Sequence, residues 1–236
     1  MTKALNIGCF LAEQAIKDCF AQTEAIKKQE DELMAYCREQ YQPMFYQRLA
    51  YRLQRRHINH LIVNAVLADL PPIQREVIVR KYKKQEMGIK IAMNLNMSIS
   101  RMITIDRAVQ ENVDHMLRDM LTVRDVYSRI KVVNMIHVLD LRLGFLDQHP
   151  EITPDVNRDW LVSLHLCRKK YRLLYSAMQE IIQNAETTLH CNIIAARLYD
   201  PSLTSKALSA ICHVSQNGIN RHLRTYEEEM SPYLMA

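Results

Sequence analysis

Glycine is scarce in this chain, with 4 residues among 236, and this scarcity restricts both its fold and its chemistry. So few turn residues do not suit a many-stranded sheet, whereas abundant alanine, leucine, isoleucine, glutamine, lysine and 13 methionines favour helices. A phosphate-binding glycine loop, a nucleophile elbow and an HExxH zinc motif are also missing. We therefore expect an all-helical protein that is not an enzyme and needs no cofactor.

Long apolar runs are missing too, because charged residues interrupt them within about a dozen positions. Neither a membrane span nor a signal peptide is expected, which predicts a cytoplasmic protein. The 6 cysteines show no CxxC spacing and mostly occupy apolar helical positions, as reduced core thiols do. His57 and His60 have a spacing that metal ligands use on a helix, but no third ligand accompanies them, so no metal site is expected.

Positive charge is concentrated in one part of the chain. Residues 43–124 contain 14 basic and 7 acidic side chains, while the whole chain has a net charge of +5. A local excess of this kind attracts the phosphate backbone of nucleic acids. A solvated basic surface without a ligand is the alternative explanation.

The segment over residues 67–113 has the pattern of a helix-turn-helix. Pro71 and Pro72 suit the first turn of a helix, where backbone N–H groups have no partner, and apolar residues follow at helical spacings. Ala92 is small where a second helix must approach a third, and Ser98 can cap that third helix. This order of helices would leave the outer face of the third free to enter a DNA groove.

The residues of this segment resemble a known family. The run LADLPPIQREVIVRKY, followed by IAMNLNMSISRM, is similar to the C-terminal (region 4-like) DNA-binding region of bacterial sigma factors, and more closely to the ArpU-like phage transcriptional regulators. The resemblance covers roughly residues 50–115. It implies a sequence-specific DNA-binding regulator of phage or mobile-element type, with double-stranded DNA as partner and RNA polymerase as a further candidate.

A second candidate motif, with three helices, occupies about residues 190–230. Its expected helices are residues 192–199, a helix from Thr204 to Cys212, and a third helix opened by Ser215. A shift of 117 residues places Arg80 on Arg197, Tyr82 on Tyr199, Met97 on Val214, Ser98 on Ser215 and Met102 on Ile219. An ancient duplication and two independent three-helix units both explain this alignment.

The third helices of the two motifs differ in their chemistry. The second carries asparagine, glutamine and arginine, which make bidentate bonds to adenine and guanine edges in the major groove. Its alternative role is a cap on the C-terminal core, because Glu227, Glu228 and Glu229 would repel phosphate. Arginines on a preceding helix, about residues 44–69, would flank the first motif. The candidate DNA-binding residues are Arg48, Arg52, Arg55, Arg56, Ser98, Ser100, Arg101, Thr104, Arg107, Ser215, Gln216, Asn217, Asn220, Arg221 and Arg224.

Long helices are expected to form the framework around the motifs. They cover about residues 4–38, 123–148 and 154–184, and the clearest boundary is the segment 149–155, where Thr153 would cap a helix begun by Pro154. We expect an N-terminal domain over residues 1–122 and a C-terminal domain over residues 123–236. The first helix has an apolar seam from Cys9 to Cys37, and the last has a seam of Trp160, Leu164, Cys167, Tyr171, Leu174, Met178 and Ile181 that predicts deep burial.

These seams offer helix surface for a homodimer, which would present two motifs about 34 Å apart to a symmetric site. Internal packing of the seams, with the two motifs of one chain gripping an asymmetric site, is the competing arrangement. A second hypothesis for function is a non-catalytic helical interaction factor, anti-sigma-like or a scaffold, that uses its three-helix units for packing. Exposed third helices would favour the regulator, and buried ones the scaffold.

Overall fold

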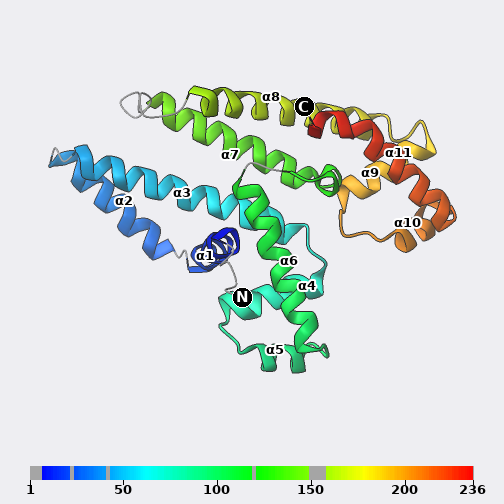
Figure 1. Ribbon diagram of the computed structural model, residues 1–236, viewed down its shortest axis with the longest axis horizontal. Helices are drawn as coiled ribbons and strands as arrows, with labels where there is room; N and C mark the ends of the chain where they lie inside the picture. Colours follow the sequence, from blue (N-terminus) through cyan, green and yellow to red (C-terminus); the bar gives the residue numbers. More distant parts are fainter. Residues whose placement is uncertain (1–6, 22–23, 41–42, 119–120, 149–157, 236) are drawn as a thin grey trace, which may run out of the picture. The chain divides into compact units, whose positions relative to one another are not determined.

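The computed structural model describes residues 7–21, 24–40, 43–118, 121–148 and 158–235. All regular structure in these ranges is helical, so the all-helical prediction is confirmed (Figure 1). The chain divides into two compact units, one of residues 1–67 with 71–117, and one of residues 68–70 with 118–236.

The first unit contains six α-helices and a short π-helix. Their bounds are α1 Ile7–Ala21, α2 Glu24–Glu39, α3 Pro43–Ala68, α4 Pro72–Ile78, the π-helix η1 Val79–Lys83, α5 Gly88–Asn94 and α6 Ile99–Leu117. Helix α1 packs against α6, and the buried Ala12 and Ile16 belong to the same core as Val109 and Val113. The first apolar seam is therefore partly filled inside the unit.

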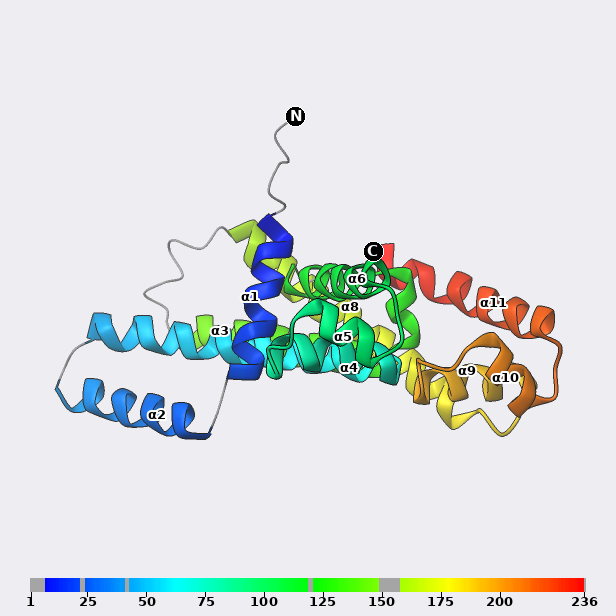
Figure 2. The ribbon, with the colours of Figure 1, turned by 90° about the horizontal axis from the view of Figure 1, so that it is seen from below.

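The single helix expected over residues 4–38 is wrong. Helices α1 and α2 run in different directions (Figure 2), and residues 22–23 lie outside the described ranges. Both helices contact α3, α1 through Cys19 and His60 and α2 through the ion pair of Glu30 with Arg56, and α1 also packs on α6. One straight helix could not make all of these contacts. Cys9, at the start of the expected seam, has a side chain outside the described part.

The second unit begins with a short 3-10 helix, η2, at Val123–Tyr127, followed by α7 Arg129–Gln148 and α8 Arg158–Gln183. It ends with α9 Leu189–Tyr199, α10 Ser205–Cys212 and α11 Gln216–Met235. Helices α7 and α8 lie side by side (Figure 1). The two ends of α8 differ, because α9 and α11 pack along its C-terminal half, where Lys170 donates a hydrogen bond to Leu234 O of α11. The single helix expected over residues 123–148 is wrong, because two elements, η2 and α7, occupy these residues. Thr122 and Asp125 form a capping box at the start of η2.

The deep burial predicted for the α8 seam is confirmed at four of its seven positions and wrong at its start. Leu164, Tyr171, Leu174 and Met178 are buried, Cys167 and Ile181 are half-buried, and Trp160 is 44% exposed. Trp160 lies in the first turn of α8, at the end of the α7–α8 pair that is away from α9 and α11 (Figure 1). The cap expected at Thr153 and Pro154 lies outside the described residues.

A buried lysine at the start of α7 forms ion pairs with two aspartates, Asp125 of η2 and Asp69. The Lys131 ammonium is 2.6 Å from Oδ1 of Asp125 and 2.9 Å from Oδ2 of Asp69, and only 5% of the residue is exposed. Buried charges of this kind are retained only when they are paired, because each would otherwise lose its hydration without compensation. The two carboxylates also raise the pKa of Lys131 against the lowering effect of its burial.

Candidate nucleic-acid interface

The first motif consists of α4, η1, α5 and α6, in the order expected of a helix-turn-helix. Val77 of α4, Ile91 of α5, and Met102 and Ile105 of α6 form its core, with Leu95 and Met97 packed against it. Pro72 opens α4, as the sequence predicts, and Ala92 is buried where α5 approaches α6. These contacts fix the direction in which α6 projects.

A left-handed residue and a serine cap form the turn between α5 and α6. Asn96 has φ of 49°, a conformation that asparagine tolerates better than most residues. The Ser98 hydroxyl accepts a hydrogen bond from the N–H of Arg101 at 3.1 Å, which confirms the predicted cap. The serine thus provides a hydrogen-bond acceptor for one of the N–H groups at the start of α6 that have no partner within the helix.

Asp106 joins α6 to the π-helix η1 through hydrogen bonds. Its carboxylate accepts hydrogen bonds from Lys81 at 2.6 Å and from Tyr82 at 2.9 Å, and Gln110 donates to the same group at 3.1 Å. Asp106 is only 8% exposed, so these donors replace most of its water. Sequence reasoning did not identify this network, although an acidic residue inside an apolar helical stripe was the available signal.

The second motif consists of α9, α10 and α11. Each helix begins with a side-chain cap, because Thr188, Thr204 and Ser215 accept hydrogen bonds from the N–H groups of residues three positions ahead, at 3.1, 3.2 and 3.2 Å. The caps predicted at Thr204 and Ser215 are confirmed, and the one at Thr188 was not foreseen. Leu208 and Ile219 are fully buried between α10 and α11.

The two motifs share one backbone register. The helices of the second begin 117 residues after those of the first: α9 follows α4, α10 follows α5 and α11 follows α6. The left-handed turn residue His213, with φ of 54°, takes the place of Asn96. The turn hydrogen bond repeats as well, from Met97 N–H to Ala92 O at 3.0 Å and from Val214 N–H to Ser209 O at 3.3 Å.

The register does not extend to every side chain. Tyr82 is 8% exposed and bonded to Asp106, whereas its counterpart Tyr199 is 92% exposed. The agreement is therefore in the cap of the third helix, the turn and the core of the second and third helices. Duplication stays a prediction, since two independent motifs of this kind would share the same features.

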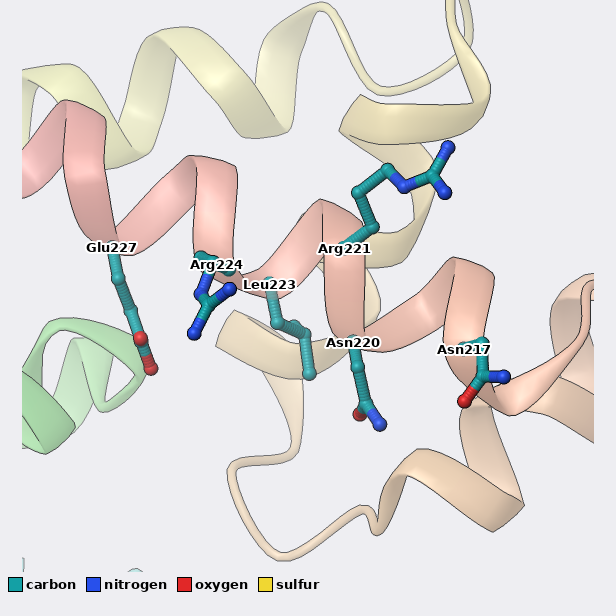
Figure 3. A pocket seen from close by; sticks show the side chains of 6 residues that line it. All are labelled: Asn217, Asn220, Arg221, Leu223, Arg224 and Glu227. Atoms are coloured by element: carbon teal, nitrogen blue, oxygen red, sulfur yellow. The ribbon is translucent and has the colours of Figure 1, made fainter.

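The predicted reading residues of α11 are all on its surface. Ser215, Gln216, Asn217, Asn220, Arg221 and Arg224 are exposed. A shallow hollow runs along this helix, and Asn217, Asn220, Arg221, Leu223, Arg224 and Glu227 line it (Figure 3). Asn217 and Asn220 project from the same side of α11, whereas Arg221 points away from them (Figure 3). The two amides can therefore face one ligand together.

Asn220 is held by the neighbouring helix. The Ser205 hydroxyl, in the first turn of α10, donates a hydrogen bond of 2.7 Å to Oδ1 of Asn220. This bond orients the amide and leaves its two N–H donors and one lone pair of the oxygen available. An amide presented in this way matches the donor and acceptor pair on the major-groove edge of adenine.

The middle of α11 is fixed to its own unit by two tyrosines. The Tyr226 hydroxyl donates to Val126 O at 2.8 Å, and the Tyr127 hydroxyl donates to Leu223 O at 2.6 Å. Burial is the main cause of the raised pKa of both phenols. Neither tyrosine was singled out from the sequence. Helix α11 is thus anchored at its middle, while its first turns remain exposed.

The corresponding surface of α6 is less polar. Ser98, Ser100, Arg101, Thr104 and Arg107 are exposed as predicted, but Ile99 and Ile103 are exposed beside them, at 46% and 48%. The Thr104 hydroxyl donates to Ser100 O at 3.0 Å within the helix. The hydroxyls and two arginines of α6 can contact phosphate, but the exposed part of its first two turns carries no amide for base recognition.

The arginines of α3 fall into different environments. Arg52 and Arg55 are exposed, whereas Arg56 is engaged by Glu30 and so contributes to packing of α2 on α3. The side chain of Arg48 lies outside the described residues. Other cations of the first unit are also paired, since Glu76 binds Arg80 at 2.7 Å and Lys84 at 3.3 Å, which lowers the pKa of Glu76. Part of the local positive excess is therefore neutralised inside the unit.

The histidines His57 and His60 do not form a recognisable ligand set. His60 lies 3.4 Å through Nδ1 from the Cys19 thiol of α1, and burial raises the pKa of that thiol to about 11. Among the described residues, no three histidine, cysteine or acidic side chains gather as a metal site would require. The described cysteines, Cys19, Cys37, Cys167, Cys191 and Cys212, are free thiols.

No family model, curated protein or solved structure matches the chain. In the described part of the chain, no helix combines the length and the apolar character needed to traverse a bilayer.

Proposed function

We propose that this protein is a sequence-specific DNA-binding transcription regulator in which α11 of the second motif reads the bases. The observation that carries this proposal is the row of exposed Gln216, Asn217 and Asn220 at the start of a capped third helix, with Arg221 and Arg224 beyond them. Amides and guanidinium groups are the side chains best suited to purine edges in the major groove. The likeness of the first motif to ArpU-like regulators supports the same class of function.

The division of roles along α11 follows from its geometry. Asn217 and Asn220 lie on one side and would contact base edges, with Ser205 holding the second amide. Arg221 points to another side and would contact a phosphate, which positions the helix without reading sequence. The acidic residues near its far end would keep the backbone of the duplex close to its first turns.

The number of copies on DNA stays a prediction. The apolar seams no longer argue for a homodimer, because Ala12 and Ile16 pack inside the first unit and Leu164, Tyr171 and Leu174 are buried in the second. A single small motif makes few base contacts, however, so we propose a homodimer on DNA, with two second motifs about 34 Å apart. Light scattering of the complex with a selected duplex distinguishes one copy from two.

Selection from random duplexes with the full chain tests the proposal. We expect one enriched sequence that contains an A·T pair contacted by Asn220. Asn220→Ala should lower affinity for that sequence by about 10- to 100-fold and change non-specific binding little, since one bidentate contact contributes about 1–3 kcal/mol. Arg221→Ala should weaken binding to all duplexes and reduce the slope of log affinity against log salt by about one.

Arg107 of α6 and Arg224 of α11 occupy equivalent positions in the two motifs, so replacing each by alanine compares the contribution of the two third helices to DNA binding. If α6 also lies on DNA, Arg101→Ala and Arg107→Ala should each weaken binding to all duplexes without unfolding the chain. No enriched sequence, or equal affinity of wild type and Asn220→Ala for the selected duplex, would remove the proposal. The alternative, a helical interaction factor, would then remain, and the exposed apolar residues of the first motif favour it.

A further inference from the structure

The first motif has an exposed apolar face where the second has polar reading residues. Its residues are Met87, Ile89, Met93, Ile99 and Ile103, with exposed fractions of 75, 63, 72, 46 and 48%. We propose that this apolar face binds an acidic amphipathic helix of another protein. This inference does not rest on DNA binding by the second motif.

The apolar face is formed by residues of two neighbouring helices, α5 and α6. Ile89 and Met93 are one turn apart on α5, and Ile99 and Ile103 are one turn apart on α6. The start of α5 lies against α6, because a Cβ atom added to Gly88 would be 3.0 Å from the Cε atom of Met102. The second motif shows the same proximity, since the residues equivalent to Gly88 and Ile103 are Ser205 and Asn220, which are hydrogen bonded.

The chemistry of this face is unsuited to reading DNA. Isoleucine can contact only the methyl group of thymine, and it leaves the donors and acceptors of a base pair unpaired. The equivalents of Ile99 and Ile103 in the second motif are Gln216 and Asn220, which can pair with those groups. Burying an apolar face against a protein, by contrast, gains free energy in proportion to the area removed from water.

The extent of the face selects a short helix over a second copy of the chain. Five partly exposed side chains of this size offer on the order of 500 Å² of apolar surface. A stable homodimer needs about 800 Å² from each partner. A docked amphipathic helix needs less, because its affinity comes from a few apolar anchors spaced by one turn.

The charge around the face selects an acidic partner. Lys90, Arg101 and Arg107 are exposed on α5 and α6. Asp106 is the sole acidic residue between positions 87 and 107, and it is buried and bonded to Lys81. Like charges across an interface disfavour binding, and opposite charges steer association. A helix with apolar anchors and flanking glutamates therefore fits this surface.

Two fluorescent synthetic peptides test the inference. Both carry leucine at positions i, i+4, i+7 and i+11; the remaining positions are mainly glutamate in one and lysine in the other. Fluorescence anisotropy with the full chain should show micromolar binding of the acidic peptide and at least tenfold weaker binding of the basic one. Ile103→Asn and Met93→Gln should each weaken binding of the acidic peptide, by about tenfold for Ile103→Asn, because central anchors carry most of the affinity.

Matched variants separate this result from loss of folding. Ile130→Asn replaces an exposed isoleucine of α7 in the other unit and should leave peptide binding unchanged. Circular dichroism should show equal helix content for all variants, since each replaced side chain is exposed. Asn220→Ala should also bind the acidic peptide normally, so failure of the DNA proposal and failure of this one are distinguishable.

Three results would overturn the inference. The first is absence of binding, or equal binding of the two peptides, which would remove the acidic helix as occupant. The second is a homodimer of the free chain that Ile103→Asn dissociates, which would identify a second copy on this face. The third is a loss of DNA affinity in Ile103→Asn with peptide binding intact, which would show that the face lies on DNA.

Discussion

The two motifs have the same backbone plan and different exposed chemistry. Helix starts, the left-handed turn residue and the serine cap repeat at a distance of 117 residues, at Asn96 and Ser98 and again at His213 and Ser215. The exposed positions that follow differ, with Ile99 and Ile103 in one motif and Gln216 and Asn220 in the other. The comparison shows that caps, turn and core determine how a third helix is presented, while its exposed side chains determine what it can bind.

The motifs also differ in how the third helix is held. Asp106 of α6 bonds to Lys81, Tyr82 and Gln110, whereas the equivalent position of α11 is Leu223, whose backbone oxygen accepts from Tyr127. A side-chain network fixes the first helix, and a backbone contact with aromatic packing fixes the second. The first motif should therefore depend more on one polar side chain than the second does.

The largest expected effect follows from this difference. Asp106→Ala should destabilise the first motif by about 3 kcal/mol, because it leaves a half-buried lysine and a buried phenol without their partner. Leu223→Ala should cost about 1 kcal/mol, since Leu223 is only partly buried and the Tyr127 contact uses its backbone. Native-state hydrogen exchange of α4–α6 and of α9–α11 measures the two effects separately.

Asp106→Asn provides the control for size. It keeps an oxygen that can accept from Tyr82 but removes the charge opposite Lys81, so its effect should lie between wild type and Asp106→Ala. Equal loss of protection in α4–α6 and α9–α11 for the alanine variants would show that the two third helices are held to the same degree.

Local signals explain most of what the sequence predicted correctly. The caps at Ser98, Thr204 and Ser215 depend on residues within one turn, and the order of helices depends on apolar spacing. The break between α1 and α2 could not be predicted, because it depends on α6 and on Arg56 of α3, which are distant in sequence. The exposure of Trp160 likewise depends on where the other helices pack along α8, which no periodicity encodes.

The candidate site was predicted by residue type, but not by environment. The exposure of Asn217 and Asn220 agrees with their predicted role, whereas the bond from Ser205 to Asn220 joins residues of two helices and has no sequence signature. Arg56 is the opposite case. Its residue type and spacing predicted a DNA contact, but its guanidinium group forms an ion pair with Glu30. A basic residue can be assigned to a ligand only when its internal partners are known.

A smaller effect is expected at the turn of the second motif. A Cβ atom on Gly218 would lie 2.6 Å from Cγ1 of Val214, and a branched valine cannot move away freely. The first motif has Arg101 and the flexible Met97 at these positions. Gly218→Ala should therefore destabilise the second motif by about 1 kcal/mol in spite of the better helix propensity of alanine.

A double-mutant cycle shows whether the close contact is the cause. In a Val214→Ala background the same Gly218→Ala change should be neutral or stabilising, because the obstructing methyl group is absent. Urea denaturation of the four chains measures the coupling. Additive effects of the two substitutions would exclude the Val214 contact as the reason for glycine at this position.

The smallest expected effect is a dependence on pH that His222 contributes to the second motif. Nδ1 of His222 lies 3.1 Å from Nδ1 of His190 on α9, and partial burial, His190 and Arg221 all lower the pKa of His222. When the pKa of a histidine is lowered in the folded state, the free energy of unfolding has its full value at pH above the pKa in the unfolded chain, which is about 6.5. Stability is then lost as pH falls through that value, because the unfolded chain binds the proton first. The carboxylate of Glu229 lies 3.8 Å from Nε2 of His190 in this pair.

Replacement of His222 by glutamine should therefore reduce the fall in melting temperature between pH 7.5 and pH 5.5, by no more than about 2 °C. His60 of the first unit also has a pKa lowered mainly by burial, so it should sustain part of the fall in the His222→Gln variant. His137→Gln, at an exposed site of α7, is the matched control and should follow the wild-type curve. A His222→Gln variant that loses more stability at pH 5.5 than wild type would show that the protonated pair, held by Glu229, stabilises the second motif instead.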